Sequence, residues 1–496
     1  MTPVKETENP LARKLCLVLV VLIVFLMPNQ LRELTIRFRL EEKQFLPINV
    51  CDVLLCAGLL ALLLKLAYQG FRNVLLPPAA CIAVVIAPAL SLYFAPSRLA
   101  GAKDVLQNLE YYVVGVAVFA NLVSWRRLKT LVAVFVLGTA AVAIWAFCQY
   151  AGGVSAMRVS GPLEDRNMLG VFFALSVPFL FGYLLWTECL VCRIGIGLII
   201  VAALVSTLSG GALIGIAVAC LFIAALRGRW AFLLTVAAVL VAAGPVSLVL
   251  RPYHSRTLRA SVAPLLKDNY LLSDAQLFRR ARLLDSELDR PEDALRCMNQ
   301  LRERRTLSQE ESDFAERLAE KLEESGREPA LWGDALPARR YQRWTAALAA
   351  ASRNPAVGLL GSGPGSFNLA TKQLFSELGI EAPSYRTDEP EVFNLAPDEP
   401  NSFNQYLVAL VEGGVVGLLA VLWLWLCFIV LGLQTYFEAH SDFGKGTALA
   451  IVGALVGTGI AGIFSSAMTR GTGLCLAFVF ASLLCLQRIV HGESRN

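Results

Sequence analysis

The sequence predicts an all-α polytopic membrane protein with about 12 transmembrane helices and a large, mostly helical extracytoplasmic loop between helices 9 and 10. Of its 496 residues, 56% are hydrophobic and only 17% are charged. A soluble domain is nearer half apolar and a quarter charged, and a disordered chain is more polar still. The composition therefore excludes both classes and leaves a membrane protein.

Apolar runs of about membrane-spanning length recur along the chain. A helix needs about 20 apolar residues to cross the hydrocarbon core of a bilayer. The runs lie at about 15–28, 49–69, 74–95, 105–124, 130–149, 168–186, 190–208, 211–226, 230–250, 404–433, 446–467 and 471–489.

The first run has features of a signal peptide, since Arg13 and Lys14 precede the apolar residues 15–27. No small-residue cleavage site follows it, and the next residues are charged. With many more spans downstream, the sequence favours a first membrane helix.

Lys and Arg are more frequent in the short loops on one side of this arrangement, the side that holds both termini. Because such residues accumulate in cytoplasmic loops, both termini are expected in the cytoplasm. The sequence then divides into an N-terminal bundle of about nine spans (1–250), an extracytoplasmic loop (251–403) and a C-terminal bundle of about three spans (404–496).

The long loop is charged and has the periodicity of helices. Residues 275–325 resemble a helical hairpin, and Ser308 with Glu311 forms a capping box. Residues 339–351 predict another helix, which is followed by a glycine-rich turn over 358–365. That turn lacks the Gly-Lys-Ser/Thr ending of a nucleotide-binding loop, so it is either a tight turn or a backbone surface for a lipid phosphate.

Charge and cysteine content exclude further classes. The net charge is +5 and is not gathered on one face, so no nucleic-acid partner is expected. Most of the 12 cysteines lie inside apolar runs, where they act as small hydrophobic residues. Cys189 and Cys192 form a Cys-x-x-Cys pair, but no second pair or nearby His predicts metal or redox chemistry there.

Several short motifs follow one another in a defined order. They are Arg340-x-x-x-Trp344, Asn354-Pro355-x-x-Gly358, Gly363-Pro-Gly-Ser-Phe367, Asn404-Gln-Tyr-Leu407 and Glu412-x-Gly414-x-x-Gly417. Upstream, Arg158-Val-Ser-Gly161 and Asn167-Met-Leu-Gly170 precede a span. This order, with the large loop between spans 9 and 10, resembles the O-antigen ligase and O-antigen polymerase family over about 150–215 and 338–420.

The resemblance implies a glycosyltransferase of the bacterial inner membrane. Such enzymes take a glycan from undecaprenyl diphosphate at the periplasmic face and attach it to a saccharide or to lipid A-core. They need no metal, nucleotide or other cofactor. Ligases and polymerases carry the same motifs, so the resemblance does not separate them.

The resemblance also assigns candidate site residues. Arg158 and Arg340 occupy arginine positions of the family, where a guanidinium neutralises the charge of the leaving pyrophosphate. The alternative for Arg158 is an arginine at the lipid headgroups, and the alternative for Arg340 is one member of a basic cluster with its neighbours. The candidate substrate-binding residues are Arg166, Asn167, Gly363, Gly365, Asn404, Glu412 and Arg470.

Two of these positions have structural alternatives. Asn404 is suited to cap the tenth span, and capping is the simpler role. Glu412 lies near the start of the same apolar helix, where an acid is costly unless it is paired or hydrated.

The sequence departs from the family pattern at two positions. Phe403, or Pro400 in a shifted alignment, stands where the family has its histidine. Ser209-Gly210-Gly211 stands where the family has Ser-Arg-Gly. His440 and His491 fall on the cytoplasmic side and His254 lies just after the ninth span, so Glu399 is the preferred candidate base, with Asp398 beside it.

Two other functions remain open. The missing histidine suggests a non-catalytic relative that binds lipid-linked glycan or supports polysaccharide assembly through its charged helical insert. A secondary transporter has a similar number of spans, but the sequence has no symmetry between two halves and a transporter does not need the long loop.

Overall fold

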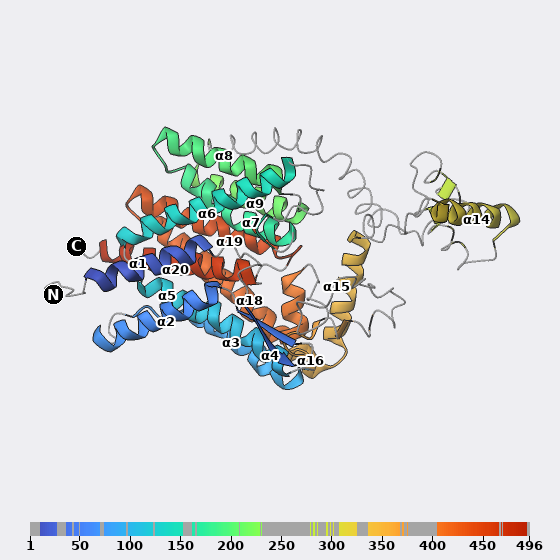
Figure 1. Cartoon of the computed structure of the whole chain (residues 1–496), viewed down its shortest axis with the longest axis horizontal. Coiled ribbons are helices and arrows are strands. Elements are labelled where there is room, and N and C mark those ends of the chain that lie inside the picture. The colour runs from blue at the N-terminus through green and yellow to red at the C-terminus, as the bar shows by residue number, and fades with distance from the viewer. Residues whose placement is uncertain are drawn as a thin grey trace. The chain divides into compact units, whose positions relative to one another are not determined.

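A computed structural model describes residues 10–26, 36–69, 74–230, 278–324, 336–374 and 404–493, with short gaps inside these ranges. The described chain is almost entirely helical (Figure 1). Its elements are α1 (Pro10–Leu26), β1 (Ile36–Glu41), β2 (Gln44–Ile48), α2 (Val50–Gln69), α3 (Ala79–Ser91), η3 (Leu92–Phe94), α4 (Arg98–Asn108), η4 (Leu109–Gly115), α5 (Val116–Leu122), α6 (Trp125–Ala151), α7 (Arg166–Leu184), α8 (Leu190–Ser206), α9 (Gly210–Arg227), α14 (Gln309–Glu324), α15 (Leu336–Ser352), α16 (Pro355–Leu360), α18 (Gln405–Glu438), α19 (Asp442–Ala461) and α20 (Arg470–Glu493).

Eight helical segments of the described chain are long and apolar enough to cross a membrane. They coincide with α2, with α4 to α5, and with α6, α7, α9, α18, α19 and α20, while α1, α3 and α8 contain shorter apolar helices. Every predicted span falls on one of these helices except 230–250, of which only Trp230 is among the described residues. The prediction of an all-α polytopic membrane protein is confirmed.

One small element departs from the prediction of helices and loops. Strands β1 and β2 form an antiparallel hairpin in which Ile36 is opposite Ile48. The sequence from Ile36 to Glu41 alternates apolar and charged residues, which is the period of a strand. Because half of these residues are charged, the segment has the composition of a polar loop between two spans.

The chain divides into two compact units, residues 1–239 with 344–496, and residues 240–343. The second unit has its own small core, made by Ala281, Ala294, Met298, Leu301, Phe314 and Leu318. These residues come from the segment predicted as a helical hairpin. The division of the chain at 250 and 403 stays a prediction.

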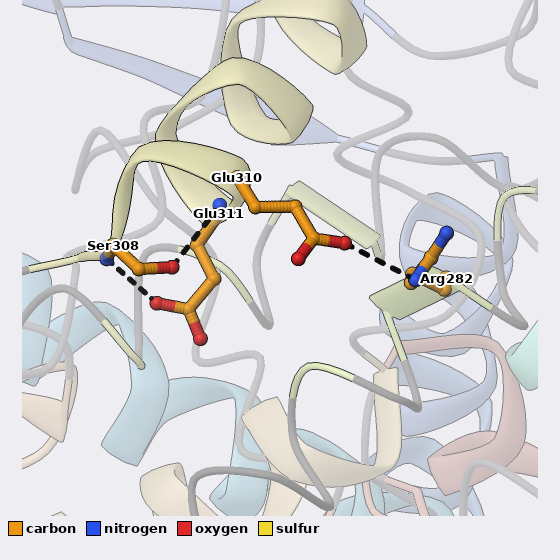
Figure 2. A network of polar contacts seen from close by, with 4 residues as sticks. All are labelled: Arg282, Ser308, Glu310 and Glu311. Carbon is orange, nitrogen blue, oxygen red and sulfur yellow. Dashed lines mark hydrogen bonds and ion pairs between the residues drawn. The ribbon is translucent and has the colours of Figure 1, made fainter.

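The capping box predicted at the start of α14 is present. The backbone N–H of Ser308 donates to Oε2 of Glu311 at 2.8 Å, and the N–H of Glu311 donates to Oγ of Ser308 at 3.5 Å (Figure 2). Beside it, Nη1 of Arg282 and Oε1 of Glu310 form an exposed ion pair at 3.3 Å. The box satisfies two backbone donors at the helix end, whereas the exposed pair adds little stability.

In the first unit, α19 packs closely against both α7 and α9 through small residues. An ideal Cβ on Gly182 of α7 would lie 2.5 Å from Cα of Ala450 in α19. One on Gly215 of α9 would lie 2.5 Å from the carbonyl oxygen of Gly457 in α19. Glycines therefore let the three backbones approach directly, which is how membrane helices gain packing energy without a hydrophobic driving force.

Gly182→Ala is expected to destabilise the protein by about 1–3 kcal/mol, since the added methyl group must displace the α19 backbone. Gly197→Ala in α8 is the matched control, because no atom outside its own helix lies within 4 Å of a Cβ there. Thermal unfolding of the purified protein in detergent measures both. An equal effect of the two changes would contradict the close packing of α7 on α19.

Candidate functional site

Helix α18 is broken near its beginning. Gly414 has φ 64° and ψ −165°, which is not helical. Residues 415–438 alone rise by about 36 Å, enough to cross a hydrocarbon core of about 30 Å. The segment 405–413, which contains Glu412, therefore extends beyond the length that a span requires.

The glycine-rich segment begins with the short helix α16. Oδ1 of Asn354 accepts a hydrogen bond from the N–H of Ala356 at 2.9 Å, and Pro355 is the first helical residue. Both positions follow the ordinary preferences of helix starts. After α16 the chain turns through Gly361, Gly363 and Gly365, whose φ angles are 87°, 98° and 72°. The predicted tight turn is present, and glycine is the residue that adopts these angles without strain.

This glycine turn lies directly on the break in α18. The N–H of Ser362 donates to the carbonyl oxygen of Val411 at 2.8 Å, and that of Gly363 donates to the carbonyl oxygen of Glu412 at 3.0 Å. In an unbroken helix these oxygens would be directed toward N–H groups four residues on. The glycine turn thus donates hydrogen bonds to α18 carbonyl groups at the place where the backbone hydrogen bonds within α18 are interrupted.

The two segments are in backbone-to-backbone contact. A Cβ on Gly361 would overlap the carbonyl of Glu412, and one on Gly414 would overlap the carbonyl of Leu359. On its other side the turn meets the first turn of α4, where a Cβ on Gly101 would lie 3.1 Å from Cγ of Pro364. The contact between the glycine turn and α18 therefore requires glycine both in the turn, at Gly361, and in α18, at Gly414.

The carboxylate of Glu412 holds the far end of the turn. Its Oε1 accepts a hydrogen bond from the N–H of Phe367 at 3.2 Å, and the backbone N–H of Gly365 also bonds to the carboxylate. Asp104 of α4 is close enough to interact with it electrostatically. The structure thus gives Glu412 a positioning role, and binding of substrate by this residue stays a prediction.

The end of α15 completes this assembly. Ala346, Ala347 and Ala350 share one buried cluster with Phe367, from the end of the turn, and Val411 of α18. Small side chains on α15 permit this close packing.

Asn404 caps α18. Its Oδ1 accepts hydrogen bonds from the N–H groups of Tyr406 and Leu407 at 2.9 and 3.1 Å. Next to it, the N–H of Gln405 donates to the carbonyl of Gly462 at 2.9 Å, so that the start of α18 is tied to the end of α19. Of the two roles considered for Asn404, capping is confirmed.

Asn404→Ala is expected to lower the free energy of unfolding by about 1 kcal/mol, because two N–H groups lose their acceptor. Asn404→Asp keeps the acceptor and is expected to have a smaller effect. Thermal unfolding in detergent compares the two. Equal losses would show that the cap does not stabilise α18.

The upstream motifs reach the same helix ends through direct contacts. A Cβ on Gly170 of α7 would lie 2.8 Å from Cβ of Ser209, which precedes α9. One on Gly211 of α9 would overlap the side chain of Phe464, two residues after Gly462. The ends of α7, α9, α18 and α19 thus bring together motifs that are far apart in the sequence.

The remaining candidate residues are placed only in part. Arg158 and Glu399 lie outside the described residues, as do Pro400 and Phe403. Arg166, Arg340 and Arg470 belong to α7, α15 and α20, but their side chains are not among those described. Asn167 is partly exposed in the first turn of α7. Within the described residues, no three His, Cys, Asp or Glu side chains are grouped to hold a metal ion.

No motif in the sequence indicates the contribution of the segment from the end of η3 into α4. Ala95 follows η3 and Gly101 and Asp104 belong to α4, and these residues approach the glycine turn or Glu412. The segment has no motif of its own, and its charges give it the pattern of an ordinary loop before a span. Only the fold shows that this segment packs against the glycine turn.

A family model described as O-Antigen ligase matches residues 195–422. The matched range includes the glycine turn, Asn404 and Glu412, together with most of α8, α9, α15, α16 and the beginning of α18. No curated protein was found to match the chain. The resemblance that the ordered motifs predict is confirmed, since residues 195–422 are similar to the O-antigen ligase family.

Proposed function

We propose that the protein is a membrane glycosyltransferase that transfers a glycan from undecaprenyl diphosphate to a saccharide or to lipid A-core. The family match supports a membrane glycan ligase or polymerase role in general. The observation that carries the proposal is the docking of the glycine turn on the break of α18, which joins the Gly-x-Gly-x-Gly and Glu-x-Gly motifs into one structure.

The reaction places definite demands on the side chains. The bond between the sugar and the diphosphate breaks, and negative charge develops on the leaving pyrophosphate. In the proposed mechanism Arg158 and Arg340 neutralise this charge, and Glu399 takes the proton of the acceptor hydroxyl. Arg166, Asn167 and Arg470, at the starts of α7 and α20, are proposed to bind the donor.

The expected topology agrees with a lipid-linked donor. With both termini in the cytoplasm, the starts of α7, α9, α18 and α20 face the periplasm of an inner membrane. A polyprenyl tail would lie among the spans while its diphosphate stays at the boundary. No metal or cofactor takes part in the proposed step.

The experiment compares glycan transfer by the purified wild type, Arg158→Ala and Arg340→Ala, with a polyprenyl-diphosphate oligosaccharide and an acceptor. Each variant is expected to lose about 100- to 1,000-fold in turnover, the usual effect of removing one group that stabilises developing charge. Arg193→Ala is the control and should retain turnover, because Arg193 is near the start of α8, which the expected topology places on the cytoplasmic side. Unchanged turnover in both test variants would refute the assigned roles.

A second candidate function rests on the missing histidine. With Phe403 or Pro400 at that position, the chain would bind lipid-linked glycan, or support an assembly complex through residues 240–343, without catalysis. Binding of the donor without turnover under any acceptor condition would favour this function.

A further inference from the structure

Two thiols lie together at the beginning of α8. Cys189 is the N-cap residue of this helix and Cys192 is in its first turn. Both are free and exposed. By contrast, Cys51, Cys81 and Cys220 are buried, where a thiol packs as a small hydrophobic residue.

The helix start directs the two side chains toward each other. Residues at the N-cap and three positions later are the pair that contacts in a capping box. Here the two thiols form a side-chain hydrogen bond, and the backbone N–H of Cys192 bonds to the Cys189 sulfur. These two hydrogen bonds lower the pKa of the Cys189 thiol, which favours the reactive thiolate.

The neighbouring groups leave this pair accessible. Nε of Arg193 donates to the carbonyl of Thr187, and Glu188 is exposed. Tyr183 of α7 interacts electrostatically with Cys192. Because Cys189 is exposed and in no disulfide, a small disulfide can reach its sulfur from solvent.

We propose that Cys189 and Cys192 form a reversible dithiol–disulfide pair that exchanges with low-molecular-weight disulfides such as oxidised glutathione. The Cys189 thiolate attacks one sulfur of the disulfide, forms a mixed disulfide and releases one glutathione thiolate. The Cys192 thiol then loses its proton to solvent and attacks the Cys189 sulfur, releasing the second glutathione. Two protein thiols are oxidised and one glutathione disulfide is reduced to two thiols. The pair lies outside the site described above, so it does not depend on the proposed transferase function.

The test treats the purified full-length protein in detergent with oxidised glutathione, and then identifies the state of the peptide that contains both cysteines by mass spectrometry. The wild type should show the loss of two hydrogens without a glutathione adduct, and dithiothreitol should reverse it. Cys148→Ser, which removes an exposed cysteine of α6, is the control and should behave as the wild type.

Single variants separate the roles of the two thiols. Cys192→Ser should retain glutathione on Cys189. Cys189→Ser should gain an adduct on Cys192 roughly threefold more slowly, because hydrogen bonds lower the pKa of the Cys189 thiol but the pKa of the Cys192 thiol is raised. A wild type that remains a dithiol, or that collects stable adducts on both residues, would overturn the proposal.

Discussion

Gly414→Ala is expected to destabilise the beginning of α18 by about 2–6 kcal/mol and to remove glycan transfer. Gly414 has φ 64°, and a residue with a side chain adopts this backbone conformation at a cost of about 1–3 kcal/mol. An added methyl group would also overlap the carbonyl of Leu359, and relieving such a clash costs a further 1–3 kcal/mol, approximately. The glycine turn would have to move away from α18, and Glu412 would lose its contact with the turn.

Gly413→Ala provides a matched control one residue away. Its backbone does not need glycine, and no atom lies within 4 Å of a Cβ built there. Thermal unfolding in detergent and a transfer assay should both separate the two variants. If Gly413→Ala and Gly414→Ala behave alike, the contact between the turn and the break does not maintain the site.

Glu412→Ala is the second change with a large expected effect. It removes the acceptor of the Phe367 N–H, and an unsatisfied buried donor costs about 1–3 kcal/mol. The cavity left beneath the turn adds to this loss. The variant should unfold at a lower temperature, and a protease should cleave it more readily within the glycine turn.

Glu412→Gln tests what the carboxylate does besides holding the turn. The amide oxygen still accepts the hydrogen bond from Phe367, so the variant should be more stable than Glu412→Ala. If Glu412 only positions the turn, Glu412→Gln should retain most of its transfer rate. A stable Glu412→Gln variant without transfer would instead show that the ionisable carboxyl group takes part in the reaction.

The membrane helices were predictable because length and composition determine them. The apolar runs at 49–69 and 446–467 overlap α2 and α19, since a helix satisfies its backbone groups within one segment in lipid. The capping box at Ser308 was also predictable, because it depends on residues three apart. The β1–β2 hairpin was missed because its strands are short and half charged.

The site was predictable as a set of motifs but not as an arrangement. Gly361 and Gly414 are widely separated in sequence, and neither motif indicates that each glycine faces a carbonyl of the other segment. The same holds for Asp104, whose approach to Glu412 depends on how α4 packs. Such contacts come from tertiary packing, which short-range patterns do not encode. The roles of Arg158, Arg340 and Glu399 stay predictions.

The most direct test of the proposed function is turnover by the wild-type protein itself. The purified chain, reconstituted in vesicles, is given a polyprenyl-diphosphate oligosaccharide together with saccharide or lipid A-core acceptors. The proposal predicts an elongated or lipid-attached glycan and an equal amount of free polyprenyl diphosphate, without added metal or nucleotide. Tight binding of the donor with no product from any acceptor would contradict it.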